Sequence, residues 1–218
     1  MARYGASRSP FSEKHEPAPV DPYGWAKLSA EHAVKNLCDI HGVEWAIAIP
    51  HNIYGERQRY NDPFRNVIAI MINRIQQGRQ PIIYGDGSQR RCFSYIADVL
   101  DPMARMGDLP ESRNEVINLG PDSEEISILE LASTLAELMN FDLDPIFVPK
   151  RPREVPVANC SAQKARETLG YSPQWSLRDG LLRTIKYIEM SGPRPFYYHL
   201  PIEIASRQTP TTWTEKLI

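Results

Sequence analysis

The hydrophobic residues of this 218-residue chain change their spacing along the sequence, and each spacing predicts a type of element. Between Tyr23 and His41, apolar residues recur three and four positions apart, which is the pattern of an amphipathic helix. Gly42 follows where a helix C-cap is expected. Residues 44–50 form a short apolar run that ends at a proline, and this predicts a buried strand.

The rest of the chain continues this alternation of helices and strands. We expect strands at 80–84, 115–119 and 145–149, and helices at 63–77, 95–105, 127–140, 161–169 and 176–190. Such alternation is typical of an α/β fold with a parallel sheet, whose ligands bind at the carboxyl ends of the strands. The tail after residue 190 is rich in Pro, Gly and aromatic residues, so we expect it to lie along the surface.

The composition argues against several classes of partner. The formal net charge is -2, so the chain lacks the basic field that nucleic-acid binding requires. The three cysteines lie far apart without a CxxC pair, which argues against a metal site and a disulfide framework and favours a reducing compartment. No run approaches the roughly 18 apolar residues of a membrane span. We therefore expect a cytoplasmic protein with a small anionic ligand and no nucleic-acid, metal or membrane site.

The strongest chemical signal is a Tyr and a Lys at the start of the first predicted helix. Tyr23 and Lys27 are four residues apart, and this spacing places both side chains on one helix face. An ammonium beside a phenol stabilises the phenolate, which is the form that accepts a proton. Taken alone, such a pair is equally typical of an exposed helix surface, so the surrounding sequence has to decide between the two interpretations.

Several motifs around this pair follow one another in the order of a known family. Residues 22–27 read PYGWAK, Glu31 follows them, Tyr4 and Gly5 precede them, and residues 51–55 read HNIYG. This order resembles the VYG, PYGxSK…E and NxYG motifs of the extended short-chain dehydrogenases, the NAD-dependent epimerase/dehydratase family. The resemblance implies an α/β fold: the C-terminal part of a Rossmann-type parallel sheet plus a small α/β substrate-binding domain.

The resemblance also assigns roles to the residues of the first two motifs. Tyr23 and Lys27 would be catalytic, and both would contact the NAD cofactor. Pro50, two residues before the Asn of NxYG, would border the nicotinamide. Asn52 would hydrogen-bond the diphosphate of a UDP-sugar or related nucleotide sugar. Without this context, an Asn after a strand is more typical of a turn.

Two later motifs imply the remaining substrate contacts up to residue 99. PIIYGDG at 81–87 is similar to a family strand whose backbone, here at Ile82 and Tyr84, would face the uracil. RCFSYIADV at 91–99 is similar to RDFIxVxDV, so Arg91 would pair with the diphosphate, for which a planar guanidinium is suited. Cys and Ser stand in this chain where the family commonly has Asp and Ile.

The motif RPREV at 151–155 resembles the family's R-x-G-[ED]. Arg151 would bind phosphate, and Glu154 would accept hydrogen bonds from the ribose hydroxyls. Standing alone, RPRE would be interpreted as an exposed charged loop. A further stretch at 162–177 is similar to the family's AxKAxxxLGYxPxxxL run, which implies scaffold and no chemistry.

These assignments divide the chain into three regions. We expect residues 1–60 and 91–122 to form the C-terminal half of the NAD-binding domain, residues 61–90 and 123–190 to form the sugar-nucleotide-binding domain, and residues 191–218 to form a surface tail. The resemblance further implies a homodimer in the intact family member, formed through the helix that carries Tyr23 and its neighbour.

The glycine-rich cofactor loop of the family does not occur in this sequence. GDGSQR at 85–90 approaches GxGxxG, but it ends in Arg and lies too late in the chain for a first βα turn. In the resembled family the loop belongs to an N-terminal βαβ region, and the catalytic Ser or Thr lies four residues before the Tyr of VYG. We therefore expect this chain to correspond to the C-terminal part of such an enzyme.

Among the reactions of the family, the first residues favour epimerisation. In the resembled epimerases, the Tyr phenolate takes a proton from a sugar hydroxyl while NAD accepts the hydride. Dehydratases and decarboxylases place an acid two residues before the Tyr of VYG, and dehydratases add an Asp one residue earlier, where this chain has Ala2 and Met1. A UDP-hexose 4-epimerase is thus expected; the alternatives are a nucleotide-sugar dehydratase or decarboxylase and an inactive UDP-sugar-binding remnant.

Overall fold

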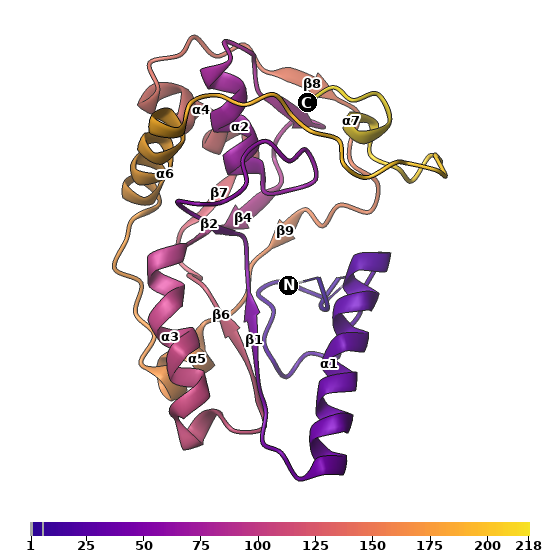
Figure 1. Ribbon diagram of the computed structural model, residues 1–218, viewed down its shortest axis with the longest axis vertical. Coiled ribbons are helices and arrows are strands. Elements are labelled where there is room, and N and C mark those ends of the chain that lie inside the picture. The colour runs from indigo at the N-terminus through magenta and orange to yellow at the C-terminus, as the bar shows by residue number, and fades with distance from the viewer. Residues whose placement is uncertain (1, 6) are drawn as a thin grey trace. The chain divides into compact units, whose positions relative to one another are not determined.

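The computed structural model describes residues 2–5 and 7–218 and divides the chain into two compact units (Figure 1). The first unit comprises Met1–Ile53, Arg91–Glu125 and Val157–Trp175. The second unit comprises Tyr54–Arg90, Ile126–Pro156 and Ser176–Ile218. Each unit is thus assembled from three segments that are distant in sequence.

Helices and short strands alternate along the described chain. The helices are α1 (Pro22–His41), α2 (Val67–Gln76), α3 (Ile96–Asp108), α4 (Ile128–Leu138), α5 (Gln163–Leu169), α6 (Leu177–Ser191), α7 (Thr211–Thr214) and the 3-10 turn η1 (Pro110–Ser112). The strands are β1 (Ala46–Pro50), β2 (Ile53–Tyr54), β3 (Ile82–Tyr84), β4 (Arg90–Cys92), β5 (Ser94–Tyr95), β6 (Glu115–Leu119), β7 (Glu125–Ser127), β8 (Ile146–Val148) and β9 (Val157–Ala158). Strand β1 pairs with β6, β2 with β5 and β3 with β8, while β7, β4 and β9 form a three-stranded sheet in that order.

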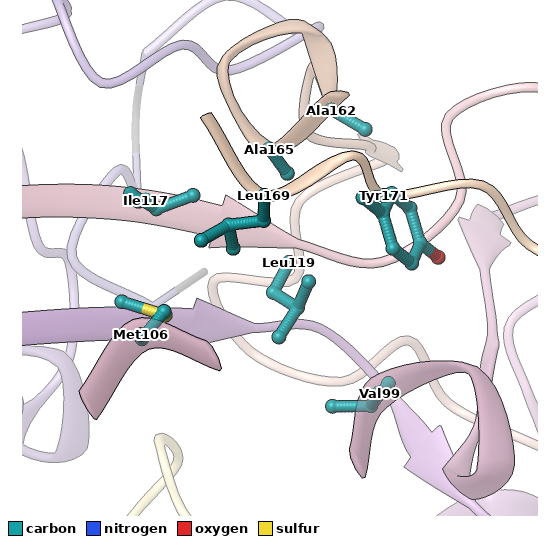
Figure 2. Packing of buried hydrophobic residues seen from close by; sticks show 8 residues of the cluster. All are labelled: Val99, Met106, Ile117, Leu119, Ala162, Ala165, Leu169 and Tyr171. Atoms are coloured by element: carbon teal, nitrogen blue, oxygen red, sulfur yellow. The ribbon is translucent and has the colours of Figure 1, made fainter. Parts of the chain in front are cut away.

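The first unit is built on the parallel pair β1 and β6. Ala46 lies opposite Glu115, and the register continues without interruption to Pro50 opposite Leu119. Helix α3 packs against β1, and α5 packs against β6 (Figure 1). Their contact buries a cluster of apolar side chains, shown in Figure 2: Val99, Met106, Ile117, Leu119, Ala162, Ala165, Leu169 and Tyr171. The carboxyl ends of β1 and β6 therefore lie side by side above a packed core.

Helix α1 begins and ends close to the predicted residues, but it buries a different face from its apolar stripe. Its buried residues are Gly24, Leu28 and Glu31. The large apolar residues of the stripe are exposed, with Leu37 at 56% and Ile40 at 68% of their accessible area. The N-terminal segment packs on this face, with Ala2 against Gly24 and Arg3 paired with Glu31. Periodicity alone identified the helix but not the face that this chain covers.

The second unit has three mutually contacting helices, α2, α4 and α6, and the parallel strands β3 and β8. Helix α2 supplies much of the core because its residues 68–75 are nearly all buried. Helix α4 starts with the capping box that its sequence predicts: Ser127 and Glu130 each accept a hydrogen bond from the other's backbone N–H. The core of the second unit thus lies largely among its helices.

The units differ from the boundaries expected from sequence at residues 54–60, which belong to the second unit, at 123–125, which belong to the first, and in two longer segments. Residues 157–175 belong to the first unit, because Leu169 and Tyr171 pack on β6 and Arg166 forms a bidentate ion pair with Asp122 at 2.9 and 3.0 Å. The tail after residue 190 belongs to the second unit. Among the described residues, no helix is long and apolar enough to cross a membrane.

Candidate functional site

The start of α1 presents Tyr23 and Lys27 together. Asp21 caps the helix by accepting a hydrogen bond from the Gly24 N–H at 2.7 Å, which fixes the first turn. The Lys27 Nζ lies 5.4 Å from the centroid of the Tyr23 ring. Tyr23 is 64% exposed, so its phenol is open to a ligand. This arrangement matches the one-face placement that the four-residue spacing predicts.

Gly24 and Gly5, the glycines of the two YG motifs, are required for close backbone contacts. A Cβ on Gly24 would stand 2.7 Å from the Ala2 carbonyl oxygen. Gly5 has a φ of +40°, and a Cβ there would overlap the Ala18 carbonyl. The N-terminal segment therefore packs directly on the first turn of α1, and larger residues at either position would separate the two.

Tyr4 ties this N-terminal segment to the sheet of the first unit. Its side chain is fully buried, stacks on Phe11 with 5.2 Å between ring centroids, and donates a hydrogen bond to the Asn118 Oδ1 at 2.8 Å. Burial raises the pKa of the Tyr4 phenol above its ordinary value. Tyr4 is thus a neutral structural residue, whereas Tyr23 is the exposed tyrosine.

Pro50, Asn52 and Arg91 lie around the carboxyl end of β1. Pro50 is the last residue of that strand. Asn52 has a φ of +46°, and its Nδ2 donates a hydrogen bond to the Cys92 carbonyl at 2.8 Å. Arg91 directly precedes Cys92 in β4. The fold therefore brings two candidate diphosphate ligands, Asn52 and Arg91, from 39 positions apart in the sequence to neighbouring backbone.

His51 and Ser94 support this turn, although no motif of the sequence assigns a role to either residue. The Ser94 hydroxyl donates a hydrogen bond to the His51 carbonyl at 2.6 Å, and the His51 Nε2 lies 2.9 Å from the Pro121 carbonyl. Gly120 leaves the space that both need, because a Cβ there would overlap the His51 ring and the Ser94 hydroxyl. Burial lowers the pKa of His51 to about 4, so its imidazole is neutral near pH 7.

In the second unit, β3 carries Ile82 and Tyr84. Strand β8 pairs with one edge of β3, from Ile82 opposite Ile146 to Tyr84 opposite Val148. Tyr84 ends the strand, and Gly85 begins the turn with a φ of +63°. The Tyr84 hydroxyl lies 2.5 Å from the Thr212 hydroxyl, so its side chain is fixed by the C-terminal part of the chain.

Arg151 and Glu154 lie in one turn of the second unit, after β8. The Glu154 N–H donates a hydrogen bond to the Arg151 carbonyl at 3.3 Å. The Arg151 guanidinium is exposed and lies 5.2 Å from the centroid of the Trp213 ring. The nine candidate residues therefore form two sets, one in each unit: Tyr23, Lys27, Pro50, Asn52 and Arg91 in the first, and Ile82, Tyr84, Arg151 and Glu154 in the second.

Comparison with known proteins agrees with the motif order and with the parallel α/β fold. The family model for GDP-mannose 4,6 dehydratase matches residues 2–184. The chain belongs to the NAD-dependent epimerase/dehydratase family. The match includes all nine candidate residues and ends before the C-terminal tail.

Relatives within this family catalyse more than one reaction according to their names. A putative UDP-glucose 4-epimerase of Methanocaldococcus jannaschii is 34% identical over 182 residues, which are 83% of this chain and 57% of the relative. UDP-glucuronic acid decarboxylase 3 of Arabidopsis thaliana is 31% identical over 159 residues, 73% of this chain and 45% of the relative. The chain thus spans about half the length of the curated relatives that it matches.

A solved structure supports the Rossmann-type fold. The UDP-glucuronic acid 4-epimerase of Bacillus cereus, crystallised with UDP-glucuronic acid and NAD, superposes with a TM-score of 0.80 at 31% identity. The superposition covers 87% of this chain and 59% of the epimerase. The fold class expected from the alternation of helices and strands is therefore confirmed.

The residues of the first unit fit one half of an NAD molecule. The exposed Tyr23 phenol and Lys27 ammonium can hydrogen-bond ribose hydroxyls, and Pro50 lies at the carboxyl end of a parallel strand, where such sheets bind cofactors. No GxxGxxG sequence occurs in the 218 residues, so these residues offer no such loop to the cofactor diphosphate. The fit is limited to the nicotinamide riboside part.

Proposed function

We propose that this chain is the substrate-binding part of an NAD-dependent nucleotide-sugar epimerase, with Tyr23 as its acid and base. The observation that carries the proposal is the exposed pair on α1, in which the Lys27 Nζ lies 5.4 Å from the Tyr23 ring. A phenol that is buried and hydrogen-bonded, as Tyr4 is, is unsuited to exchange a proton with a substrate. Tyr23 has the exposure and the neighbouring cation that this task needs.

Two side chains of this chain would perform the proton chemistry. The Tyr23 phenolate oxygen would accept the proton of a sugar hydroxyl and later return it to that oxygen of the sugar. The Lys27 ammonium would stabilise the phenolate by its charge and hold ribose hydroxyls of the cofactor. NAD, when bound, supplies the hydride acceptor that this oxidation requires. Asp21 fixes the first turn of α1, on which Tyr23 lies.

The remaining candidates would bind the nucleotide. Asn52 and Arg91 would contact the diphosphate from the first unit, and their shared backbone neighbourhood supports a common ligand. In the second unit, Arg151 is the candidate phosphate ligand and Glu154 the candidate acceptor for ribose hydroxyls. The β3 backbone at Ile82 and Tyr84 is the candidate contact to the uracil. Guanidinium groups suit this role because their planar donors match phosphate oxygens.

A decarboxylase is the second candidate reaction, and a curated relative of that name supports it. The choice between the reactions depends on the two positions ahead of Arg3. Ala2 carries no carboxylate, and its carbonyl lies against Gly24, which favours epimerisation. Met1, the other position, lies outside the described residues. The third candidate is binding of a UDP-sugar without turnover, for which the diphosphate candidates Asn52 and Arg91 would suffice.

Calorimetry on the 218-residue chain tests the proposal, with UDP-glucose and NAD titrated separately. We expect UDP-glucose to bind and Arg91→Ala to weaken it by about tenfold or more, because a charge-assisted hydrogen bond contributes roughly 1.5–3 kcal/mol. Arg90→Ala is the matched control, since Arg90 pairs with Glu130 at 3.2 Å. Equal losses from both substitutions, or no binding of UDP-glucose, would contradict the proposed site.

A turnover assay separates the three candidate functions. Conversion of UDP-glucose to UDP-galactose with added NAD, abolished by Tyr23→Phe without loss of UDP-glucose binding, would support the epimerase. Release of carbon dioxide from UDP-glucuronic acid would support the decarboxylase instead. UDP-glucose binding without NAD binding or turnover would support a substrate module, while tight NAD binding would contradict the restriction to half of the cofactor.

A further inference from the structure

The last residues of the chain pack against the second unit and form hydrogen bonds with its buried polar side chains. Thr212 is 1% exposed, and its hydroxyl lies 2.5 Å from that of Tyr84. The buried Arg74 donates from Nη1 to the Leu217 carbonyl at 2.9 Å and from Nε to the Gln80 carbonyl at 2.8 Å. The C-terminal segment, residues 210–218, is therefore a fixed part of this unit.

Trp213 of this segment contacts the candidate phosphate ligand Arg151. The guanidinium carbon of Arg151 lies 5.2 Å from the centroid of the Trp213 ring, within the range of a cation–π interaction. Phe64 in turn contacts Trp213 edge-on, with 5.2 Å between the ring centroids and an interplanar angle of 71°. The Arg151 side chain is thus placed by an aromatic surface that is itself fixed.

This mode of contact leaves the Arg151 donors available. A cation–π interaction uses the face of the guanidinium, whereas a phosphate binds the N–H groups along its edge. Among the residues that the structure describes, no carboxylate forms an ion pair with Arg151, and its side chain is exposed. Stacking on Trp213 therefore restricts the rotamers of Arg151 without occupying the edge that a diphosphate would use.

We propose that Trp213 is a positioning residue for the nucleotide diphosphate, acting through Arg151, and this rests on the proposed function of the site. The match to the family model ends at residue 184, before the C-terminal segment. Trp213 would thus add to the phosphate site a contact from outside the matched region. The same segment, through Thr212, fixes Tyr84 at the end of β3, the strand that would face the base. Ordering Arg151 before binding reduces the entropy that the complex would otherwise lose.

The test compares the affinities of the full chain for UDP and for uridine by calorimetry. Trp213→Leu should weaken UDP binding by about 3- to 10-fold, a range that corresponds to a cation–π interaction, and should leave uridine binding unchanged. Trp213→Phe, which keeps an aromatic face, should retain most of the affinity. In the Arg151→Ala background, Trp213→Leu should have no further effect, because the tryptophan acts through the arginine.

Tyr60→Leu is the matched control for a general loosening of the unit. Tyr60 also stacks under an arginine, Arg194 at 5.1 Å, and is buried, but neither residue is a candidate ligand. Three outcomes would overturn the positioning role and leave the proposed function standing. The first is a loss of UDP affinity in Tyr60→Leu equal to that in Trp213→Leu. The others are equal losses of UDP and uridine affinity in Trp213→Leu, and unchanged UDP binding in Trp213→Leu. Absence of UDP and UDP-glucose binding in the unmodified chain would overturn both.

Discussion

Arg3 and Glu31 form a buried ion pair that joins the N-terminal segment to α1. The Arg3 Nη1 donates to both carboxylate oxygens of Glu31, at 2.8 and 2.7 Å, and the two residues are only 8% and 7% exposed. Lys35 donates a further hydrogen bond to Glu31 at 2.8 Å from the helix surface. This pair connects the segment that holds Tyr4 to the helix that holds Tyr23.

Breaking this pair should destabilise the chain strongly. Glu31→Gln leaves the Arg3 charge buried without its counter-charge, a change that typically costs about 3–5 kcal/mol of unfolding free energy. Lys35→Met is the control, because the more exposed partner should contribute about 1 kcal/mol or less. Urea unfolding followed by circular dichroism measures both. Similar losses of unfolding free energy in the two variants would show that the buried pair with Arg3 contributes no more than the surface pair with Lys35.

Two Gly→Ala substitutions should have opposite effects on stability. Gly5→Ala should destabilise the chain by more than 1 kcal/mol, because the backbone has a positive φ and the new Cβ would overlap the Ala18 carbonyl. Gly107→Ala in α3 should stabilise it by up to about 1 kcal/mol, since nothing lies within 4 Å of the new Cβ and Ala favours helix. Thermal unfolding measures the difference, and a tolerated Gly5→Ala would show that the N-terminal segment does not pack as described.

His51 should make the stability of the chain depend on pH. Burial lowers its pKa from 6.5 to about 4, so the unfolded chain takes up a proton between these values that the folded chain does not. The contribution of neutral His51 to the free energy of unfolding is therefore complete above about pH 6.5. The folded state should lose up to about 3 kcal/mol as the pH falls to about 4, and no more below that.

A glutamine at position 51 removes this titration while offering an amide N–H to the Pro121 carbonyl. The slope of unfolding free energy against pH between 4 and 6.5 should be shallower in His51→Gln than in the original chain. His32→Gln is the control, because His32 is exposed on α1. Identical slopes in the original chain and in His51→Gln would rule out a neutral buried imidazole.

A homodimer through α1, implied by the family resemblance, remains a prediction. The exposed apolar stripe that includes Val34, Leu37 and Ile40 is the surface that such a dimer would bury. Sedimentation should show a dimer that Leu37→Asp converts to a monomer, because a carboxylate would be desolvated in the contact. Asn36→Asp adds the same charge beside the stripe and should leave the dimer intact. A monomeric original chain at all concentrations would contradict the prediction.

Each of the long elements was predictable because its hydrophobic spacing records which positions face a core. Strand β6 occupies the predicted residues 115–119, and α4 begins at the predicted capping box. Strands β3 and β8 lie within the predicted strands 80–84 and 145–149. The other short strands, β2, β4, β5, β7 and β9, were not predicted, because two or three residues contain no period. The segment 157–175 was assigned to the wrong region, since its packing on β6 involves residues about 50 positions away.

The candidate site was predictable only in part, for the same reason. Motif spacing placed Tyr23 and Lys27 on one face, and the structure has them so. The carbonyl of Cys92 that holds Asn52 in place could not be inferred, because a long stretch of chain separates the two residues. The Trp213 contact with Arg151 lacked any sequence signal, as it depends on how the tail returns to β3.

The sequence by itself determined the family, the order of the elements and the pair on α1, because these depend on residue types at short spacing. Tertiary structure alone decided which face of α1 is buried, which charges are paired inside and which aromatic ring meets Arg151. The physical reason is that burial and charge pairing arise between residues distant in the chain. Their free energies depend on three-dimensional neighbours that no local pattern specifies.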